Sequence, residues 1–504
     1  MLLLHARNMV TAELISVTVL VGIIYITNHV WKSMTYWKVR GVKHRTPLPL
    51  VGNMLRAFKF DKHFFHLYDK LYHTFPEERM VGMYEFTTPT LVLRDPELIK
   101  TVLVSEFSTF SDRGPLLFNP DCVLYSSIFA LKGNKWRAIR NKVLTPFTTG
   151  RLKSLFPSVT GACMAFVDSD PKELTLDIIK QLTLRIFSQT MFGVELKSAE
   201  ADILRKNLGK MMAASKTKLV QQIGLMYFPR LCDFMSFKFM PVHLDNYFRS
   251  LLNAILNKKV EDSSWRNDVI RILNQMRKDG KINFYDKVNN KEEIFDVTDE
   301  LAQAQALFLL VAAVEPSSLV LIHLAYDLAQ SPDCQTKARQ EVKAQFKKYG
   351  EYSWECVKDM KYLNCCLKET LRLHPPLQFL NRVCNRYTEL GGVKLKKGTR
   401  IVVPLHVLHL DSNYFPDPKT YKPERFLEDK QHKFIYLPFS EGPRMCLGSR
   451  FFILEALILF AQILDKFELS LSKEMKLPLK YEPNTVFLTP KYNNPVIINL
   501  KRIT

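Results

Sequence analysis

Residues Phe439-Ser-Glu-Gly442-Pro-Arg444-Met-Cys446-Leu-Gly448 form the stretch that decides the fold of this chain. Its two glycines allow the backbone to turn tightly and to approach a flat ligand without an intervening Cβ atom. Arg444 offers a planar fork of donors that suits a carboxylate. Backbone N–H groups at the start of a following helix can stabilise a negatively charged sulfur on Cys446. The pattern therefore indicates a ligand site, whereas the alternative is that Cys446, one of nine cysteines, is a small buried apolar side chain.

The spacing of this stretch resembles the F-x-x-G-x-R-x-C-x-G loop of the cytochrome P450 family. The resemblance implies a mainly α fold with a small β portion. It also implies a haem b cofactor whose iron is held by the Cys446 thiolate, a ligand that favours O–O cleavage. Phe439, Arg444 and Gly448 would belong to the same haem site. The resemblance covers the chain from about residue 45 onward, and residues 106–114, 144–150 and 409–418 are most similar to insect microsomal members.

Two further motifs resemble the positions that hold the haem propionates in this family. Trp136 and Arg140 form a W-x-x-x-R pattern, and Arg382 resembles the second propionate arginine. Residues four apart lie on the same face of a helix, and an indole N–H is a donor that suits a carboxylate. Taken alone, each residue would be an ordinary surface feature. Together they would surround two buried propionates with positive charge.

An ion pair is expected on the helix that ends at Pro375. Glu369 and Arg372 are three residues apart and share one helical face, and the leucines beside them indicate burial. A buried pair would need a further partner, and Arg425 resembles the third member of this group in the family. The resemblance gives the three residues a structural role in the haem-side scaffold. Spacing alone is also compatible with a solvated surface pair.

The helix expected to activate oxygen departs from the family pattern A/G-G-x-D/E-T-T/S. Residues 312–318 read AAVEPSS, so the acid is kept as Glu315, the glycine is Ala313 and the threonine is Pro316. In the family the threonine hydroxyl organises water and relays protons, whereas proline has neither a hydroxyl nor an N–H. Ser317 could replace the hydroxyl only if the proline re-aims it, because one residue is roughly 100° around a helix. Glu315 and Ser317 are therefore the candidate catalytic residues.

Three functions are compatible with these motifs. The first is a monooxygenase that inserts oxygen into a lipophilic molecule such as a steroid, fatty acid, terpenoid or xenobiotic. It would take NADPH-derived electrons from cytochrome P450 reductase, with cytochrome b5 as an optional partner. The second is a haem-thiolate isomerase that rearranges a peroxide and needs neither reductase nor proton relay. The third is a haem-binding protein with little turnover. The first is favoured, and Pro316 keeps the other two open.

The composition argues against several other classes. Apolar residues make up 47% of the 504 residues, which is enough for a substantial core. The nine cysteines are scattered, odd in number and without a CxxC pair, which argues against a disulfide framework or a zinc site. The formal net charge of +21 indicates an acidic partner surface or anionic lipid. No zinc finger or RNP signature accompanies this charge, so no nucleic-acid partner is expected.

The amino terminus predicts a membrane anchor. Residues 14–30 are mostly apolar, and residues 10–12 extend them toward the roughly 17–25 residues of a membrane helix. Basic residues follow this run, so the body is expected in the cytosol, on a single-pass protein of the endoplasmic reticulum. The alternative is a cleaved signal peptide, but no small-residue cleavage site follows. We expect an anchor at 1–31, a basic and proline-rich connector at 32–53 and a haem domain at 54–504.

Apolar periodicity predicts a mostly helical body without internal repeats. Helices are expected over residues 60–73, 174–192, 203–211, 301–329 and 333–348. Strands are expected over residues 84–93 and 400–403, with paired strands in 485–500. Residues 211–248 mix methionine and aromatic residues with lysines. This segment is either ordinary core or a flexible lid that dips into lipid over an apolar substrate entrance.

Overall fold

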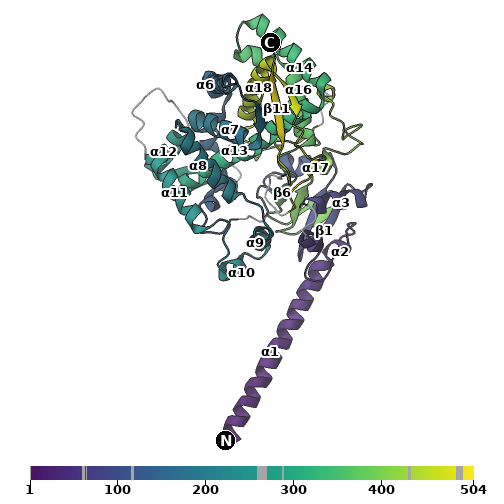
Figure 1. The fold of residues 1–504 in the computed structure, drawn as a ribbon. Coiled ribbons are helices and arrows are strands. Elements are labelled where there is room, and N and C mark those ends of the chain that lie inside the picture. The colour runs from purple at the N-terminus through teal and green to yellow at the C-terminus, as the bar shows by residue number, and fades with distance from the viewer. Residues whose placement is uncertain are drawn as a thin grey trace.

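The fold is mainly helical, with a small β portion and one long helix that projects from the body (Figure 1). The computed structural model describes residues 2–59, 63, 65–114, 118–257, 269–286, 289–428, 433–483 and 492–503. The helical body and the minor β portion agree with the fold class expected from the sequence.

Helices account for most of the described chain. The α-helices are α1 Leu2–Met34, α2 Tyr36–Val39, α3 His66–Thr74, α4 Pro96–Lys100, α5 Gly133–Val143, α6 Thr149–Asp168, α7 Leu176–Phe192, α8 Ser198–Met211, α9 Lys216–Tyr227, α10 Pro229–Phe234, α11 Val242–Asn257, α12 Val269–Asp279, α13 Asp299–Gln330, α14 Pro332–Tyr349, α15 Trp354–Lys358, α16 Lys361–Leu373, α17 Leu405–Leu408 and α18 Ser449–Lys466. Short 3-10 or π segments are η1 Met54–Lys59, η2 Thr101–Ser105, η3 Val123–Ser126, η4 Thr145–Phe147 and η5 Pro423–Phe426.

The strands form four small sheets. They are β1 Met80–Glu85, β2 Thr88–Leu93, β3 Glu173–Thr175, β4 Lys281–Asp286, β5 Lys291–Asp296, β6 Leu380–Val383, β7 Thr388–Leu390, β8 Val393–Leu395, β9 Arg400–Val403, β10 Phe467–Leu471 and β11 Ile497–Arg502. The largest sheet has the order β1-β2-β9-β6, in which β2 and β9 run parallel. A second sheet has the order β10-β11-β3. Both sheets join segments that are distant in sequence: the first joins β1 and β2 to β9 and β6, and the second joins β10 and β11 to β3.

Helix α13 is the centre of the core. Thr298 caps its first turn by accepting a hydrogen bond from the Leu301 N–H, at 3.1 Å between Oγ1 and N. Its residues are apolar on all sides and almost all are buried, which is typical of a helix that crosses a core. Among the described residues α13 is also the one helix long and apolar enough to cross a membrane, but 78% of that apolar window is buried in the body, as in a core helix. The membrane anchor expected at residues 1–31 therefore stays a prediction. Pro316 lies inside α13, and the helix continues through it.

The amino-terminal segment divides into a projecting helix and a packed segment. Helix α1 extends away from the body along most of its length (Figure 1). Trp37 in α2 is fully buried, and its indole Nε1 donates to the Met83 carbonyl at 2.9 Å. A Cβ atom at Gly82 would lie 2.5 Å from the Trp37 ring, so the glycine makes room for this contact. Within the connector expected at 32–53, Tyr36 and Trp37 are therefore buried in the body, and His44 and Gly52 form isolated bridges to β1.

Most expected elements are confirmed, with differences at their ends. Helices α8, α13 and α14 cover the predicted ranges, and strand β9 matches its predicted range of 400–403. Helix α7 begins at residue 176 and not at 174, because residues 174 and 175 belong to strand β3. The single strand expected at 84–93 is wrong, because Phe86 at φ +56° turns the chain between β1 and β2. The carboxy-terminal strand β11 pairs with β10 and β3, and residues 485–491 of the expected pair lie outside the described chain. For the helix expected over residues 60–73, the structure shows α3, which begins at residue 66. Residues 60–62 and 64 of that range lie outside the described chain.

Candidate active site

The cysteine loop is held by its own backbone. The Cys446 N–H donates to the Phe439 carbonyl at 2.9 Å. Gly442 has φ +75°, and a Cβ atom there would lie only 2.0 Å from the carbonyl oxygen of Leu103 in η2. Gly448 has φ −89°, and a Cβ atom there would meet nothing closer than 3.9 Å. Gly442 therefore makes the tight turn expected of both glycines, whereas Gly448 does not. The close approach to a flat ligand expected at both glycines stays a prediction.

Cys446 is the one exposed cysteine among the nine, and Gly448 caps helix α18 directly after it. Although its side chain has accessible surface, Cys446 lies deep in the body, and this withdrawal from bulk water raises the pKa of its thiol. The backbone N–H groups of Gly448 and Ser449 and the charges of Arg140 and Arg113 oppose that rise. The sulfur is thus placed where an α-helix start and two cations stabilise its anionic form.

Four arginines from separate segments converge beside this loop, and we call them the arginine cluster: Arg113, Arg140, Arg382 and Arg444. Arg382 and Arg444 are 3% and 2% exposed. The Nε and Nη2 atoms of Arg382 and the Nε and Nη1 atoms of Arg444 have no hydrogen-bond partner. The carboxylate of Asp112 lies 3.7 Å from Arg444, between Oδ1 and Nη2. One carboxylate does not balance this positive charge, so the cluster suits an additional dianionic group.

The pKa values of two of these arginines also indicate that the cluster lacks negative charge. Burial lowers the pKa of Arg382 to about 10. Burial and repulsion from Arg382 lower the pKa of Arg444 to about 9. Such shifts mark buried cations that lack counter-charges. The residues present suit a haem: Cys446 could ligate its iron, and the unpaired guanidinium donors could bind its two propionates.

Trp136 and Arg140 lie together on α5, as their spacing predicts. The Trp136 ring is 2% exposed and carries the Arg444 guanidinium on its face, with 4.0 Å between Cζ and the ring centroid. Arg140 donates from Nη2 to the Met445 carbonyl at 2.8 Å. Both residues therefore position the cysteine loop and its arginine. Sequence reasoning missed Arg113 as a member of this cluster, although it lies in a stretch already noted for its resemblance.

Helix α13 has a solvent-accessible strip formed by Phe308, Ala312 and Pro316. The candidate catalytic residues Glu315 and Ser317 lie beside this strip and not on it. Ala312 is exposed and Phe308 and Pro316 are half-buried, at a spacing of four residues that places them on one face. Glu315 is buried, and its two carboxylate oxygens accept from the Lys180 ammonium of α7 at 2.9 and 2.8 Å. Ser317 is 9% exposed. Sequence reasoning missed Lys180, since nothing in the sequence pairs it with α13.

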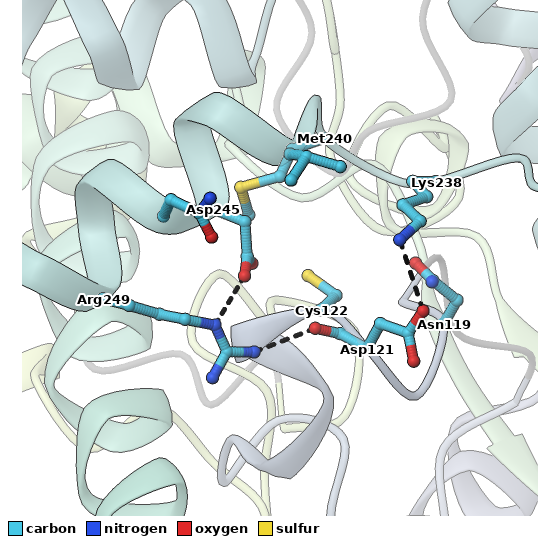
Figure 2. A pocket seen from close by; sticks show the side chains of 9 residues that line it. Asn119, Asp121, Cys122, Lys238, Met240, Asp245 and Arg249 are labelled. Carbon is cyan, nitrogen blue, oxygen red and sulfur yellow. Dashed lines mark hydrogen bonds and ion pairs between the residues drawn. The ribbon is translucent and has the colours of Figure 1, made fainter.

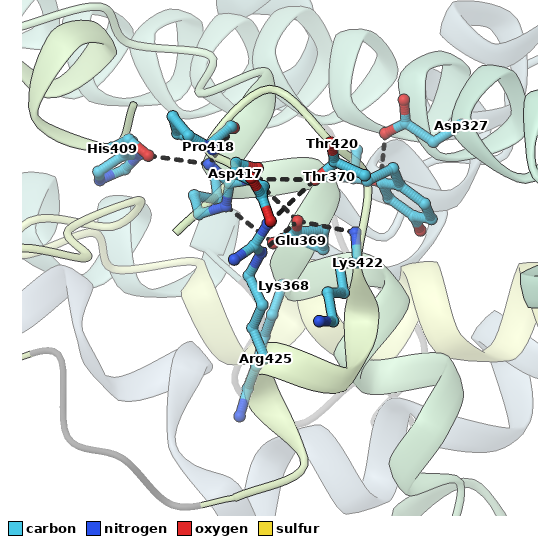
Figure 3. Close-up of polar contacts among 12 residues, drawn as sticks. Asp327, Lys368, Glu369, Thr370, His409, Asp417, Pro418, Thr420, Lys422 and Arg425 are labelled. Atoms are coloured by element: carbon cyan, nitrogen blue, oxygen red, sulfur yellow. Dashed lines mark hydrogen bonds and ion pairs between the residues drawn. The ribbon is translucent and has the colours of Figure 1, made fainter. Parts of the chain in front are cut away.

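The predicted ion pair of Glu369 and Arg372 on α16 is present and fully buried. Figure 3 shows Glu369 among the surrounding polar contacts. Arg372 binds Glu369 through two hydrogen bonds, from Nε and Nη2, each 2.8 Å long. Arg425 adds a third at 3.1 Å from its Nε, and the Lys422 N–H adds a fourth at 2.9 Å. The remaining donors of Arg372 reach backbone carbonyls, including that of His409 at 2.9 Å. The buried pair therefore has two further partners, the Arg425 side chain and the Lys422 N–H.

His409 connects this ion-pair group to the cysteine loop. Its Nε2 accepts from the Leu437 N–H at 3.0 Å, and the Leu437 carbonyl accepts from the Ser440 N–H at 3.0 Å. Burial and the charge of Arg372 lower the pKa of His409 to about 3, so the ring is neutral and Nε2 can accept. The scaffold thus reaches from α16 to the loop of Cys446. Sequence reasoning noted the run that begins at His409 but gave the residue no role.

Comparison with known proteins agrees with this geometry. The family model described as Cytochrome P450 matches residues 42–498. Cytochrome P450 6B2 of Helicoverpa armigera is 31% identical, over 95% of this chain and 95% of its own length. Probable cytochrome P450 6d5 of Drosophila melanogaster is 31% identical, over 84% of this chain and 88% of its own length. Cytochrome P450 6B1 of Papilio polyxenes is 29% identical, over 96% of this chain and 98% of its own length. The expected similarity to insect members is confirmed.

Proposed function

Because this chain belongs to the cytochrome P450 family, whose members are haem monooxygenases, we propose that it inserts one atom of O2 into a lipophilic small molecule. The second oxygen atom leaves as water, with two electrons from NADPH and two protons consumed. The observation that carries the proposal is the cysteine loop, which the arginine cluster surrounds with unpaired donors.

The cofactor is haem b, held by residues of four segments. Cys446 would ligate the iron, and Phe439 and Gly448 shape the loop around it. The propionates would pair with the arginine cluster and the Trp136 N–H. When bound there, haem supplies an electron-rich, thiolate-ligated iron that favours O–O cleavage. Glu369, Arg372 and Arg425 support this site through His409 and take no part in the chemistry.

Proton supply is assigned to Glu315 and Ser317, which flank Pro316 on α13. Glu315 is held by Lys180, so it would deliver a proton only after that ammonium releases one of its oxygens. Ser317 is one position around the helix from the accessible strip. Neither residue occupies the position of the missing threonine, which predicts that this enzyme leaks more peroxide than relatives with a hydroxyl at that position.

The substrate side of the site is apolar. The rings of Phe308 on α13 and Phe129 are 5.4 Å apart between centroids, and Ala312 and Pro316 continue the accessible strip. No ionisable side chain lies on that strip between residues 308 and 316, which are all described. Apolar surface of this kind favours a lipophilic compound, such as a steroid, fatty acid, terpenoid or xenobiotic.

The location proposed is the membrane of the endoplasmic reticulum, with α1 as a single-pass anchor and the body in the cytosol. Helix α1 is 33 residues long, about 50 Å at 1.5 Å per residue, and exceeds the thickness of a bilayer core. Leu14, Leu20 and Ile24 on α1 are each more than half exposed in the absence of lipid. Lys32, just before the end of α1, and the basic residues that follow it favour the cytosolic side for the body.

The electron donor is NADPH–cytochrome P450 reductase, with cytochrome b5 as a second donor. The basic excess of the chain suits the acidic surface of such a flavoprotein. Lys132 and Lys142 flank or lie on α5 and are exposed, as is Arg450 at the start of α18. Helix α5 contacts the cysteine loop through Arg140, and α18 follows the loop directly, so these three residues would offer a docking partner positive charge near that loop.

A reconstitution of the full chain with haem, reductase and NADPH tests the proposal. Oxygenated product that rises in step with NADPH consumption supports a monooxygenase. Turnover with organic peroxide and none with NADPH would instead identify a peroxide-rearranging enzyme, the function that Pro316 would permit. A thiolate-type carbon monoxide spectrum without either turnover would identify a haem-binding protein.

The role of Pro316 is tested by two substitutions. Pro316→Thr restores the hydroxyl, and we expect more product and less peroxide for each NADPH consumed. Pro316→Ala is the matched control, because it restores the backbone N–H without adding a hydroxyl. Equal improvement in both variants would show that the backbone, and not the missing hydroxyl, limits proton supply.

A further inference from the structure

A charged pocket with two parts lies between the loop at residues 119–122 and the segment that joins α10 to α11. Figure 2 shows the first part. Its first part has a volume of about 260 Å³ and its second about 350 Å³, close to the lower range of small-molecule sites. The two parts share Asn119, Asp121 and Lys238. Neither part is lined by the arginine cluster or the cysteine loop, so the pocket is separate from the candidate active site.

One side of the pocket is a fixed frame. Asp245 accepts from Arg249 Nε at 2.6 Å and from the Val123 N–H at 3.0 Å. Arg249 also donates from Nη2 to the Asp121 carbonyl at 2.8 Å. These contacts involve largely buried side chains and two backbone groups, so they hold the loop against α11 whether or not the pocket contains a ligand.

The other side carries an ion pair that can exchange partners. Lys238 and Asp121 are 3.4 Å apart between Nζ and Oδ2, and their side chains are 39% and 70% exposed. An exposed pair of this length contributes about 1 kcal/mol or less. Because Lys238 and Asp121 are exposed and only weakly paired, both charges are available to a ligand. The second part of the pocket adds a further carboxylate, from Asp233.

The charges in the pocket have both signs. Lys238 and Arg249 are accompanied by Asp121, Asp245 and Asp233. A ligand with only negative charge would meet carboxylates, and a ligand with only positive charge would meet cations. A ligand that carries a phosphate and an ammonium a few bonds apart satisfies both sets at once.

Exposed apolar side chains border the pocket. Phe234 is 88% exposed, and Leu231, Met235 and Val242 are 54%, 50% and 54% exposed. Helix α10, which carries the first two of these residues, lies at the lower edge of the body, at the end from which α1 projects (Figure 1). If α1 spans a bilayer, this edge faces the lipid headgroups. Residues 211–248, expected to be either core or a lid, therefore contain both kinds of surface. Met211 and Phe248 are buried in the core, whereas α10 has apolar side chains that are exposed.

We propose that this double pocket binds the headgroup of a zwitterionic phospholipid. The phosphate is recognised by Lys238, since Arg249 is already engaged by Asp245, the Asp121 carbonyl and Glu300. The amine is recognised by Asp121 and Asp233. The acyl chains extend over the apolar border at α10 into the bilayer. The proposal rests on the membrane attachment in the proposed function, but the recognition chemistry resides in the pocket alone.

A soluble headgroup tests the pocket without a membrane. Full-length protein in a nonionic detergent is titrated calorimetrically with glycerophosphocholine, glycerophosphoethanolamine and inorganic phosphate. We expect saturable binding of the two zwitterions and weaker binding of phosphate. Lys238→Ala should weaken zwitterion binding about fivefold, the equivalent of one exposed charge contact. Lys206→Ala, an exposed lysine on α8, is the matched control and should leave it unchanged.

Every outcome of this titration decides the proposal. No binding by either zwitterion, or equal weakening in both variants, would overturn it. Tighter binding of phosphate than of the zwitterions would identify an anion site instead. A protein that binds glycerophosphocholine but remains in solution without detergent would contradict the membrane anchor and leave the headgroup site in place. Nanodiscs of phosphatidylcholine and of phosphatidylglycerol then identify the source, and slower hydrogen exchange of residues 236–250 is expected only in the former.

Discussion

Glu455 is a buried acid whose protonation should make stability depend on pH. It lies on α18, is 1% exposed, and its Oε1 has no hydrogen-bond partner. Burial raises its pKa from 4.5 to about 8, and only the Thr183 side chain of α7 opposes the shift. The folded protein therefore keeps a proton that the unfolded chain loses above pH 4.5. Stability falls as pH rises through this window, by up to about 5 kcal/mol for a shift of this size.

Glu455→Gln removes the titration and keeps the shape of the side chain. The variant should gain stability over the wild type as pH rises from 5 to 8, and the difference should level off above the folded pKa. Pulse proteolysis in urea at several pH values measures the free energy of unfolding of both proteins. Infrared spectroscopy gives an independent readout, since the carbonyl band of a protonated carboxyl group should be present in the wild type and lost in the variant.

The matched control is Glu468→Gln, which changes an exposed glutamate on β10. Its stability difference from the wild type should stay constant over the same range. The reasoning about Glu455 is refuted if the wild type and Glu455→Gln differ by the same free energy at pH 5 and pH 8.5. It is also refuted if the protonated carboxyl band persists in the variant, because another group would then carry the proton.

Three further substitutions test the scaffold around the cysteine. Ser440 has φ +61°, which is less favourable for a residue with a Cβ atom than for glycine, so Ser440→Gly should stabilise the protein by about 1 kcal/mol in thermal unfolding. Ser440→Ala removes the same buried hydroxyl but keeps the strained backbone, so it should stabilise the protein less than Ser440→Gly. Gly442→Ala should cost at least about 2 kcal/mol and reduce haem retention, because its Cβ would overlap the Leu103 carbonyl; a normal haem spectrum and melting temperature would contradict this. Glu369→Gln leaves Arg372 buried without its counter-charge and should cost about 3–5 kcal/mol in urea unfolding, and a loss below 1 kcal/mol would show that the backbone carbonyls suffice.

Sequence reasoning reached the parts of the site that depend on short spacings. Trp136 and Arg140, or Glu369 and Arg372, lie within one helical turn, so a regular helix brings each pair together without knowledge of the fold. The cysteine loop is likewise a local pattern, and its one error, at Gly448, arose because a helix cap with negative φ does not need glycine.

The residues that sequence reasoning missed are those paired over long distances. Lys180 and Glu315 are separated by 135 positions, and His409 and Leu437 by 28. Such contacts depend on how helices and loops pack, and no periodicity of either segment encodes them. The same reason explains the amino-terminal segment: Trp37 is buried because β1 offers it the space above Gly82, which the basic and proline-rich composition around it does not reveal.

The arginine cluster has a consequence for the biogenesis of the protein. Four cations near one another in a low-dielectric interior repel, so the nascent chain cannot close this region at low energy on its own. An acidic cofactor removes that repulsion, which makes its arrival a step of folding rather than an addition to a finished body. We therefore expect the haem-free chain to be degraded faster than the haem-bound protein. The amount of this protein in a cell should therefore follow the supply of haem more closely than the amount of its messenger RNA.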